Sequence, residues 1–383
     1  MAFAAADLRY ASAAARPLAD RQDDNPGLKT LPDPDVSGTK PGPPQQRFSN
    51  HPGLIKAGGR VLVTPHMKPI VALSTCWCSH RHHDGFEMLK EIADLGFAWV
   101  ELSHGIKITL VPGILRAVEE GVIQVASCHN FCPLPTGVLH AAPNLYMPSS
   151  ADARERDQWM RHSKRTIDFA HQMKAPKVVV HLGSTEFFWF NPARKLDAYL
   201  EAHPGADLAD DAGYQKILAK ALAKLKDRMP VYWENTKQGL IELLPYAVQK
   251  GVKLGFENRE RFEELPLDAD HAALLEALAR PEACGYWHDC GHAQIKQNMC
   301  LLNHREHLEK NAPNAIGFHL HDVSAEGRDH QAIGSGTVDF EMVSSFWRPE
   351  HTLVIELHPR LTVEEVLASK ARVDELLTAR FGR

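Results

Sequence analysis

Short apolar, β-branched runs alternate with amphipathic segments along most of this 383-residue chain. Such alternation is typical of repeated β/α units, which build a parallel sheet covered by helices. Eight units over about 316 residues fit a closed (β/α)8 barrel, the TIM barrel fold, with room for insertions. We therefore expect eight strands at Ile70–Thr75, Ala98–Leu102, Val122–Ser127, Lys177–His181, Val252–Glu257, Cys284–Asp289, Ile316–His319 and Leu353–Glu356.

The segments between these runs have helical periodicity, and two expected helices are Phe86–Leu95 and His271–Leu278. The largest insertion follows the fourth strand, because roughly 70 residues separate His181 from Val252 and one helix needs far fewer. Its first residues, 185–190, form an aromatic run. That run either roofs the site or packs the inserted helices onto the barrel.

The first 66 residues differ in composition from the rest of the chain. They are rich in Pro, Ala, Asp and Gly, which predicts a disordered extension over residues 1–66 and a barrel domain over residues 67–383. Asp7 and Arg9 interrupt the apolar core that a secretory signal needs, so export is not indicated. Because Met67 directly precedes the first strand, we expect the extension to be dispensable or to reflect a start assigned too far upstream.

Composition narrows the classes of protein that need considering. A net charge of -5 gives no basic footprint for a phosphate backbone, which disfavours nucleic acid as a partner. No run approaches the ~20 apolar residues of a membrane helix. The seven cysteines are odd in number and lack the paired spacing of a zinc ribbon, so we expect reduced thiols in a cytoplasmic protein. A homo-oligomer is compatible with the sequence, which does not fix the number of copies.

Four consecutive expected strands end in an acid or an imidazole. Parallel barrels deliver such C-terminal side chains to one mouth, so Glu257, Asp289, His319 and Glu356 are expected to meet there. Carboxylates with an imidazole suit Mn2+, Co2+, Mg2+ or Zn2+, and the residue types do not choose among these ions. Taken singly, each residue has a structural explanation, such as an ion pair between Glu257 and Arg259. Four in succession favour a metal site.

On these residues, the chain resembles the xylose isomerase-like superfamily of TIM barrels, which contains ketose 3-epimerases, hydroxypyruvate isomerase, inosose dehydratase and endonuclease IV. The resemblance extends from about Met67 to the C-terminus. The loop at 329–336 is also similar to the loop that follows the seventh strand in that family. The family's strand-end motifs fall on Glu257 at the fifth strand, Asp289 and His292 at the sixth, His319 with Asp322 at the seventh, and Glu356 at the eighth.

Residues 257–263 (Glu-Asn-Arg-Glu-Arg-Phe-Glu) are similar to the fifth-strand motif Glu-x-x-x-Arg-aromatic-Glu of ketose epimerases. The resemblance implies one divalent ion per chain, with Glu257 and Glu356 as both ligands and acid/base pair. A cation that chelates a carbonyl and a neighbouring hydroxyl acidifies the C–H between them and stabilises the enediolate. The carboxylates then remove a proton and return it to the same carbon, which is epimerisation, or to the next, which is isomerisation. Dehydration of an inosose-like cyclitol would use the same enediolate.

Further residues are expected around the substrate, a sugar or polyol. His292 would hold a substrate oxygen beside the metal, and Glu263 a hydroxyl at one end of the sugar. His321 is an alternative seventh-strand ligand, because residues two apart face the same side of a strand. His129 and His181 either donate to sugar hydroxyls or are core histidines. His330 is a further candidate for substrate contact. Three more residues are placed to touch a small polyol, although surface exposure with no role is equally consistent with the sequence: Glu101, His104 and Trp77.

Endonuclease IV supplies the alternative, because it enlarges the same site to three zinc ions. Its additional histidines would fall on His129, His181, His292 and His330. Its Asp two residues before the last His falls on Arg328, which impairs the third metal position. The preferred prediction is therefore a metal-dependent sugar, sugar-phosphate or cyclitol isomerase/epimerase. The alternative is an endonuclease IV-like zinc phosphodiesterase acting on abasic DNA.

Overall fold

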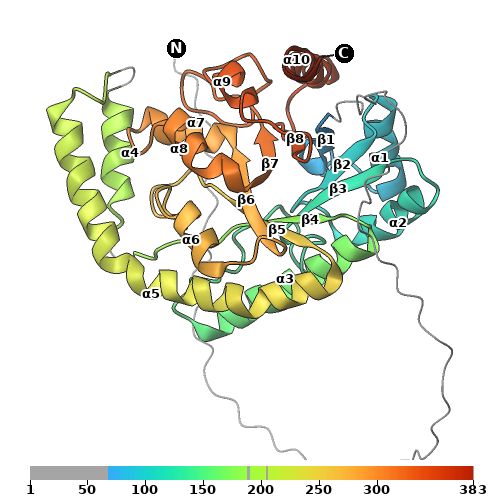
Figure 1. The fold of residues 1–383 in the computed structure, drawn as a ribbon, viewed down its shortest axis with the longest axis horizontal. Helices are drawn as coiled ribbons and strands as arrows, with labels where there is room; N and C mark the ends of the chain where they lie inside the picture. Colours follow the sequence, from blue (N-terminus) through green and yellow to red (C-terminus); the bar gives the residue numbers. More distant parts are fainter. Residues whose placement is uncertain (1–67, 188–189, 204–205, 383) are drawn as a thin grey trace, which may run out of the picture. The chain divides into compact units, whose positions relative to one another are not determined.

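The computed structural model describes residues 68–187, 190–203 and 206–382. Eight parallel strands pair in chain order, and β1 pairs with β8 to close the barrel (Figure 1). The predicted TIM barrel is confirmed, whereas the expected disordered extension over residues 1–66 lies outside the described residues. The strands are β1 (Ile70–Ser74), β2 (Trp99–Leu102), β3 (Gln124–His129), β4 (Lys177–Val180), β5 (Lys253–Glu257), β6 (Cys284–Asp289), β7 (Ala315–Leu320) and β8 (Thr352–Ile355).

The strands differ from the predicted ones mainly at their ends. β3 runs two residues beyond Ser127, because Cys128 and His129 pair with β4. β8 ends one residue before Glu356, whose backbone N–H still donates to the Leu320 carbonyl at 3.1 Å. The sheet bonding therefore holds the ends of these strands in place at the mouth of the barrel.

Helices cover the outside of the barrel. Within the described residues, no helix is long and apolar enough to cross a membrane, and all seven cysteines are free thiols. The α-helices are α1 (Gly85–Asp94), α2 (Val111–Glu119), α3 (Ala153–Gln172), α4 (Ala193–Ala202), α5 (Ala212–Lys250), α6 (His271–Leu278), α7 (Cys290–Asn298), α8 (His304–Asn311), α9 (Phe340–Ser344) and α10 (Val363–Phe381). The 3-10 helices are η1 (Thr75–Trp77), η2 (Ile108–Leu110) and η3 (Ala312–Asn314).

The insertion after β4 contains α4 and the long helix α5. Figure 1 shows α5 bent, with its first half beside α4 and its second half beside α3. Asp211 caps its start by accepting from two backbone N–H groups, and Gly251 ends it with a left-handed φ of 68°. Phe187 packs in the apolar cluster of α4 and α5, which supports the packing explanation of the aromatic run, whereas Phe190 is exposed. Residues 188–189 of that run are outside the described residues.

Strand alternation divides β6 into an inner and an outer face. Trp287 lies in the apolar cluster inside the barrel, and Asp289 follows it on the same face. Glycines on the two neighbouring strands, Gly255 and Gly317, leave room for the indole, since a Cβ at either position would press against it. Tyr286 and His288 point to the outer face, toward α6 and α8. The interior below the mouth is thus filled by Trp287.

Candidate metal centre

The ends of β5 to β8 bring four side chains together at the mouth. A carboxylate or imidazole atom from each lies within 4.8 Å of the others, and all four residues are at most 3% exposed. This mouth cluster consists of Glu257, Asp289, His319 and Glu356. The residues predicted from the strand ends as a metal site therefore converge.

The His319 imidazole lies among the three carboxylates. Its Nδ1 is 2.7 Å from Glu257 Oε1 and 3.0 Å from Glu356 Oε2. The nearest Asp289 oxygen is 3.7 Å away. Burial alone lowers the pKa of an imidazole, but Glu356 and Glu101 raise the pKa of His319 well above its ordinary value. Three carboxylate oxygens around one nitrogen form a position that requires positive charge, and a divalent cation fits it.

Glu101 fixes which nitrogen of His319 is available as a ligand. Both Glu101 oxygens lie 3.2 Å from His319 Nε2, so this nitrogen donates to Glu101 and Nδ1 is the nitrogen that would bind a cation in the cluster. Ser74 and Ser127 also donate to the Glu101 carboxylate, which is fully buried. Burial raises the pKa of this carboxyl, but the His319 charge outweighs it and the pKa is lowered. The structure thus places Glu101 behind His319, not at the surface of the mouth where substrate contact was expected.

The carboxylate of Glu257 faces two sides. While Oε1 faces His319, Oε2 lies 2.9 Å from Arg259 Nη1 and 2.7 Å from His181 Nε2. His129 Nε2 is 3.6 Å from the same oxygen. Burial raises the pKa of the Glu257 carboxyl, but the charges of Arg259 and His319 bring it well below its ordinary range. Glu257 is therefore ionised at neutral pH, as a ligand or base must be.

Hydrogen bonds from His292 and His321 hold the Asp289 carboxylate in place. The His292 backbone N–H donates to Oδ1 at 2.7 Å, which caps α7, and His321 Nε2 lies 3.0 Å from Oδ2. Because His321 Nδ1 accepts the His330 backbone N–H, its proton lies on Nε2 and is donated to Asp289. This geometry favours His319 over His321 as the seventh-strand ligand.

His292 and His330 lie beside the mouth cluster. His292 Nδ1 donates to the Asn258 carbonyl at 3.0 Å, and its ring is 4% exposed. His330 stacks on His321 at a centroid distance of 4.2 Å and pairs with Asp329 at 2.9 Å. Burial lowers the pKa of His330, but Asp329 raises it to about 10. Both histidines thus lie beside residues of the cluster, and their contact with a substrate stays a prediction.

The loop after β7 is organised by Asp322. Its carboxylate accepts four backbone N–H groups, at distances of 2.8 to 3.0 Å, from residues 323, 334, 336 and 338. The tip of this loop, residues 325–328, is exposed. Asp322, predicted only through the His-x-x-acid motif, therefore shapes the loop that carries His330.

Trp77 and Glu263 each form a hydrogen bond with another segment of the chain. Trp77 is buried, and its Nε1 donates to the Leu361 carbonyl at 2.9 Å, so it serves packing. Glu263 accepts from Asn191 at 3.0 Å. Its neighbour Glu264 is the acid that reaches Arg259, at 3.3 Å, and the sequence reading missed it. The substrate contacts expected of Trp77 and Glu263 stay predictions, and each side chain has a hydrogen-bond partner within the protein.

Comparison with known proteins identifies the family. Residues 89–351, more than half of the chain, match the family described as xylose isomerase-like TIM barrel. The chain belongs to this family. Glu356 lies just beyond the matched residues, while the other three members of the mouth cluster lie within them.

Solved structures of low sequence identity share this fold. A D-tagatose 3-epimerase-like protein is 17% identical with a TM-score of 0.55, over 81% of this chain and 97% of that one. An L-ribulose 3-epimerase is 17% identical with a TM-score of 0.56, over 82% and 96%. A 3-keto-D-glucoside 4-epimerase from E. coli is 14% identical with a TM-score of 0.56, over 80% and 100%.

One curated protein is similar to this chain in amino-acid sequence. An uncharacterized protein of Methanocaldococcus jannaschii is 23% identical over 205 residues, which are 53% of this chain and 57% of that protein. The chain thus spans little more than half the length of that relative. At these identities, the comparisons show the family and the fold.

The xylose isomerase-like barrel also contains a second group of imidazoles, on the outer face of β6. Asn258 exchanges two hydrogen bonds with the Asp289 backbone, so the orientation of its amide is fixed. Tyr286 donates to Asn258 Oδ1 and accepts from His288 Nδ1 at 2.8 Å and from His307 Nε2 at 2.6 Å. Burial lowers the pKa of every imidazole in this group. The outer histidine cluster consists of His271, His288, His304 and His307.

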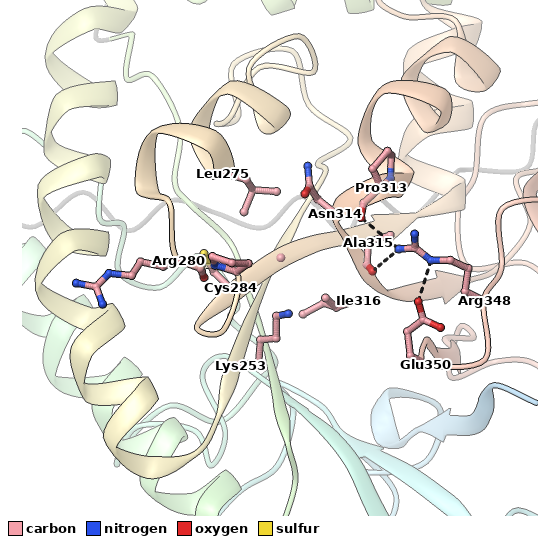
Figure 2. Close-up of a pocket in the computed structure, with 12 residues that line it drawn as sticks. Lys253, Leu275, Arg280, Cys284, Pro313, Asn314, Ala315, Ile316, Arg348 and Glu350 are labelled. Carbon is pink, nitrogen blue, oxygen red and sulfur yellow. Dashed lines mark hydrogen bonds and ion pairs between the residues drawn. The ribbon is translucent and has the colours of Figure 1, made fainter. Parts of the chain in front are cut away.

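A pocket of about 260 Å³ lies at the end of the barrel opposite the mouth, where β5, β6 and β7 begin (Figure 2). Figure 2 shows the Arg348 guanidinium directed at backbone oxygens of Pro313 and Ala315 and at Glu350. Parallel barrels place catalytic groups at the carboxyl ends of their strands. We therefore assign the pocket no part in the candidate centre.

Proposed function

We propose that this chain is a divalent-metal-dependent isomerase or epimerase of a sugar, sugar phosphate or cyclitol. The observation that carries the proposal is the position of Glu257 and Glu356, whose oxygens lie 2.7 and 3.0 Å from the same nitrogen of His319. Two buried carboxylates beside one cation position meet the needs of enediolate proton transfer. The family and the printed names of the epimerases that share its fold support the same class of reaction.

The proposed ligands of the ion are Glu257, Asp289, His319 and Glu356. A divalent ion bound there would polarise the substrate carbonyl and acidify the neighbouring C–H. The ion is proposed as one per chain, and it is Mn2+, Co2+, Mg2+ or Zn2+ on the chemistry of the donors.

The chain's own residues then carry out the proton transfers. Either Glu257 or Glu356, as the carboxylate, removes the acidic C–H proton, and the other, as the carboxylic acid, donates its own proton to the same carbon or to its neighbour. His292 and His330, which flank the cluster, are proposed to hold substrate oxygens. Burial of the mouth cluster excludes water, which strengthens each of these electrostatic contacts.

The second candidate function is an endonuclease IV-like zinc phosphodiesterase. One observation favours it: His129, His181 and Glu257 form a further group of potential ligand atoms within 4.8 Å of one another. The net charge of -5 and the Arg259 guanidinium on Glu257 Oε2 argue against it. A count of two or three zinc ions per chain, together with cleavage of abasic DNA, would establish this candidate over the first.

The test is solvent deuterium exchange at the substrate carbon, measured across a panel of ketoses, ketose phosphates and cyclitols. We expect exchange with the wild type and a loss of at least about 100-fold in both Glu257→Gln and Glu356→Gln. Glu326→Gln, an exposed acid on the loop after β7, is the matched control and should exchange normally. Exchange that persists in both site variants would refute the assigned roles.

The remaining assignments are proposals with direct checks. Cell fractionation tests the cytoplasmic location, and light scattering tests the homo-oligomer. Intact mass of the cellular protein tests whether residues 1–66 are retained before the domain that we place at 67–383.

A further inference from the structure

The Glu257 carboxylate joins two groups of ligand atoms. Its Oε1 belongs to the mouth cluster, and its Oε2 lies within reach of two imidazoles, His129 and His181. We call His129, His181 and Glu257 Oε2 the histidine pocket. All three residues are at most 6% exposed. A carboxylate shared in this way is able to bridge two cations, so the number of ions in the centre needs an explanation.

Both imidazoles of the histidine pocket direct Nε2 toward Glu257. His129 Nδ1 lies 3.0 Å from the Asn130 carbonyl, which only accepts, so Nδ1 carries a proton and Nε2 is the nitrogen left to bind a cation. His181 Nδ1 lies 2.7 Å from Asn144 Oδ1. The other end of this amide, Nδ2, donates to a Glu264 oxygen at 3.4 Å, which fixes its orientation.

The proton of His181 is therefore on Nδ1, and its Nε2 lone pair faces a carboxylate oxygen at 2.7 Å. Two electron-rich atoms at this separation are stable only with positive charge beside them. The histidine pocket thus has the donor atoms and the charge demand of a cation site.

Arg259 supplies that charge. Its Nη1 lies 2.9 Å from Glu257 Oε2 and its Nε lies 3.3 Å from Glu264 Oε1, so one guanidinium joins both acids. It is only 7% exposed, and a guanidinium stays charged at any pH at which the protein is folded. We propose that Arg259 occupies the positive-charge position beside Glu257 Oε2 and thereby keeps a second divalent ion out of the histidine pocket.

The physical basis is charge balance in a buried place. A second ion on Glu257 Oε2 would lie next to the guanidinium, and like charges repel strongly where water is excluded. Without Arg259, two buried carboxylates would lack a counter-charge, which is costly, and a second ion would restore it. Arg259 is therefore a specificity-determining residue for metal number, and this inference rests on the proposed metal centre.

The test counts bound ions per chain by elemental mass spectrometry after loading with excess Mn2+ and gel filtration. We expect one ion in the wild type and two in Arg259→Gln, whose paramagnetic resonance spectrum should show coupling between two Mn2+ ions. Arg261→Gln removes a charge of the same type from an exposed side chain of the same loop and should keep one ion. Arg259→Gln combined with His181→Gln should return to one ion.

Two ions in the wild type, or one ion in a folded Arg259→Gln, would overturn the inference. His181→Gln in the wild-type background covers a failure of Arg259→Gln to fold. It should keep one Mn2+ with an affinity within about 3-fold, since the resident ion does not use the histidine pocket. A loss of the ion or a drop of more than about 10-fold would overturn the inference as well.

The ion count is independent of turnover, which separates this inference from the proposed function. One ion in the wild type and two in Arg259→Gln, with no deuterium exchange on any ketose or cyclitol, would retain the role of Arg259 and refute the isomerase. Exchange by a wild type and a folded Arg259→Gln that each bind one ion would do the reverse.

Discussion

The mouth cluster and the outer histidine cluster lie on opposite faces of the same strand, β6. Asp289 at the mouth and His288 on the outer face are consecutive residues, and strand alternation alone separates them. The mouth holds one imidazole among three carboxylates, and that imidazole has a raised pKa. The outer cluster holds four imidazoles around Tyr286, each with a lowered pKa.

Carboxylates make the difference between these two regions. In the outer cluster, the Tyr286 oxygen accepts the N–H groups of two neutral rings, His288 and His307, and its hydroxyl donates to Asn258, so these contacts need no charge. At the mouth, the acids converge with more negative charge than their protein partners neutralise, and a cation is needed to balance it. A count of histidines would have favoured the outer cluster as a metal site. The acids beside them favour the mouth.

Replacement of Asp289 is expected to have the largest effect on metal binding, and it tests the difference between the two clusters most directly. Asp289→Asn keeps the shape of the side chain and removes a charge from the proposed ligand set. We expect a loss of at least about 100-fold in Mn2+ affinity, with deuterium exchange lost alongside. His288→Gln, the neighbouring change on the outer face, is the control and should keep its ion. An ion lost from His288→Gln but kept in Asp289→Asn would reverse our assignment of the two faces.

A fall in pH should destabilise the folded protein through protonation of His307 in the outer histidine cluster. Burial lowers the pKa of His307 from its ordinary 6.5 to about 4, so the unfolded chain binds its proton first as pH falls. Its contribution to stability is therefore fully present above pH 6.5 and is lost as the pH falls toward about 4. Between these limits, the wild type should lose up to about 3 kcal/mol more unfolding free energy than His307→Gln. Equal pH slopes in urea titrations of the two proteins would contradict this.

Replacement of Tyr286 is expected to have the smallest effect, and it tests whether the outer histidine cluster and the mouth cluster are independent of each other. Tyr286→Phe removes the oxygen that accepts from His288 and His307, and leaves two buried N–H groups without that partner. We expect a loss of about 1–2 kcal/mol in unfolding free energy, measured in urea at neutral pH. The Mn2+ content should not change, because Asn258 and His321 still hold Asp289. A fall in ion content would show that the outer cluster controls the mouth.

The barrel and the strand-end residues were predictable from the sequence because both follow from local patterns. Hydrophobic periodicity located the eight strands, and the carboxyl ends of parallel strands meet whatever the details of packing. How deep each acidic side chain lies inside the barrel was not predictable from the sequence. Glu101 is the penultimate residue of β2, and it accepts from Ser74 and Ser127 behind the mouth cluster, where it contacts His319.

The second acidic partner of Arg259, Glu264, also could not be predicted from the sequence. The sequence offered an ion pair of Glu257 with Arg259 or Arg261 as one explanation of this acid. The acid at the other end of the guanidinium depends on the irregular segment after β5. There, Glu264 forms an isolated β-bridge with Ser184 and contacts Arg259, whereas its neighbour Glu263 accepts from Asn191. A shift of one residue in such a segment leaves no trace in periodicity.

The loop gathered by Asp322 offers a position for a reporter. Its base is fixed by four N–H groups, while Glu326 at its tip is exposed, on the side of the barrel where a ligand would enter. The native thiols are poor competitors for a dye, because five are buried and only Cys76 and Cys300 are partly exposed. Burial raises the pKa of both of these thiols, which slows their alkylation further. A fluorophore on Glu326→Cys would thus label one place and signal the arrival of ligands at the mouth in real time.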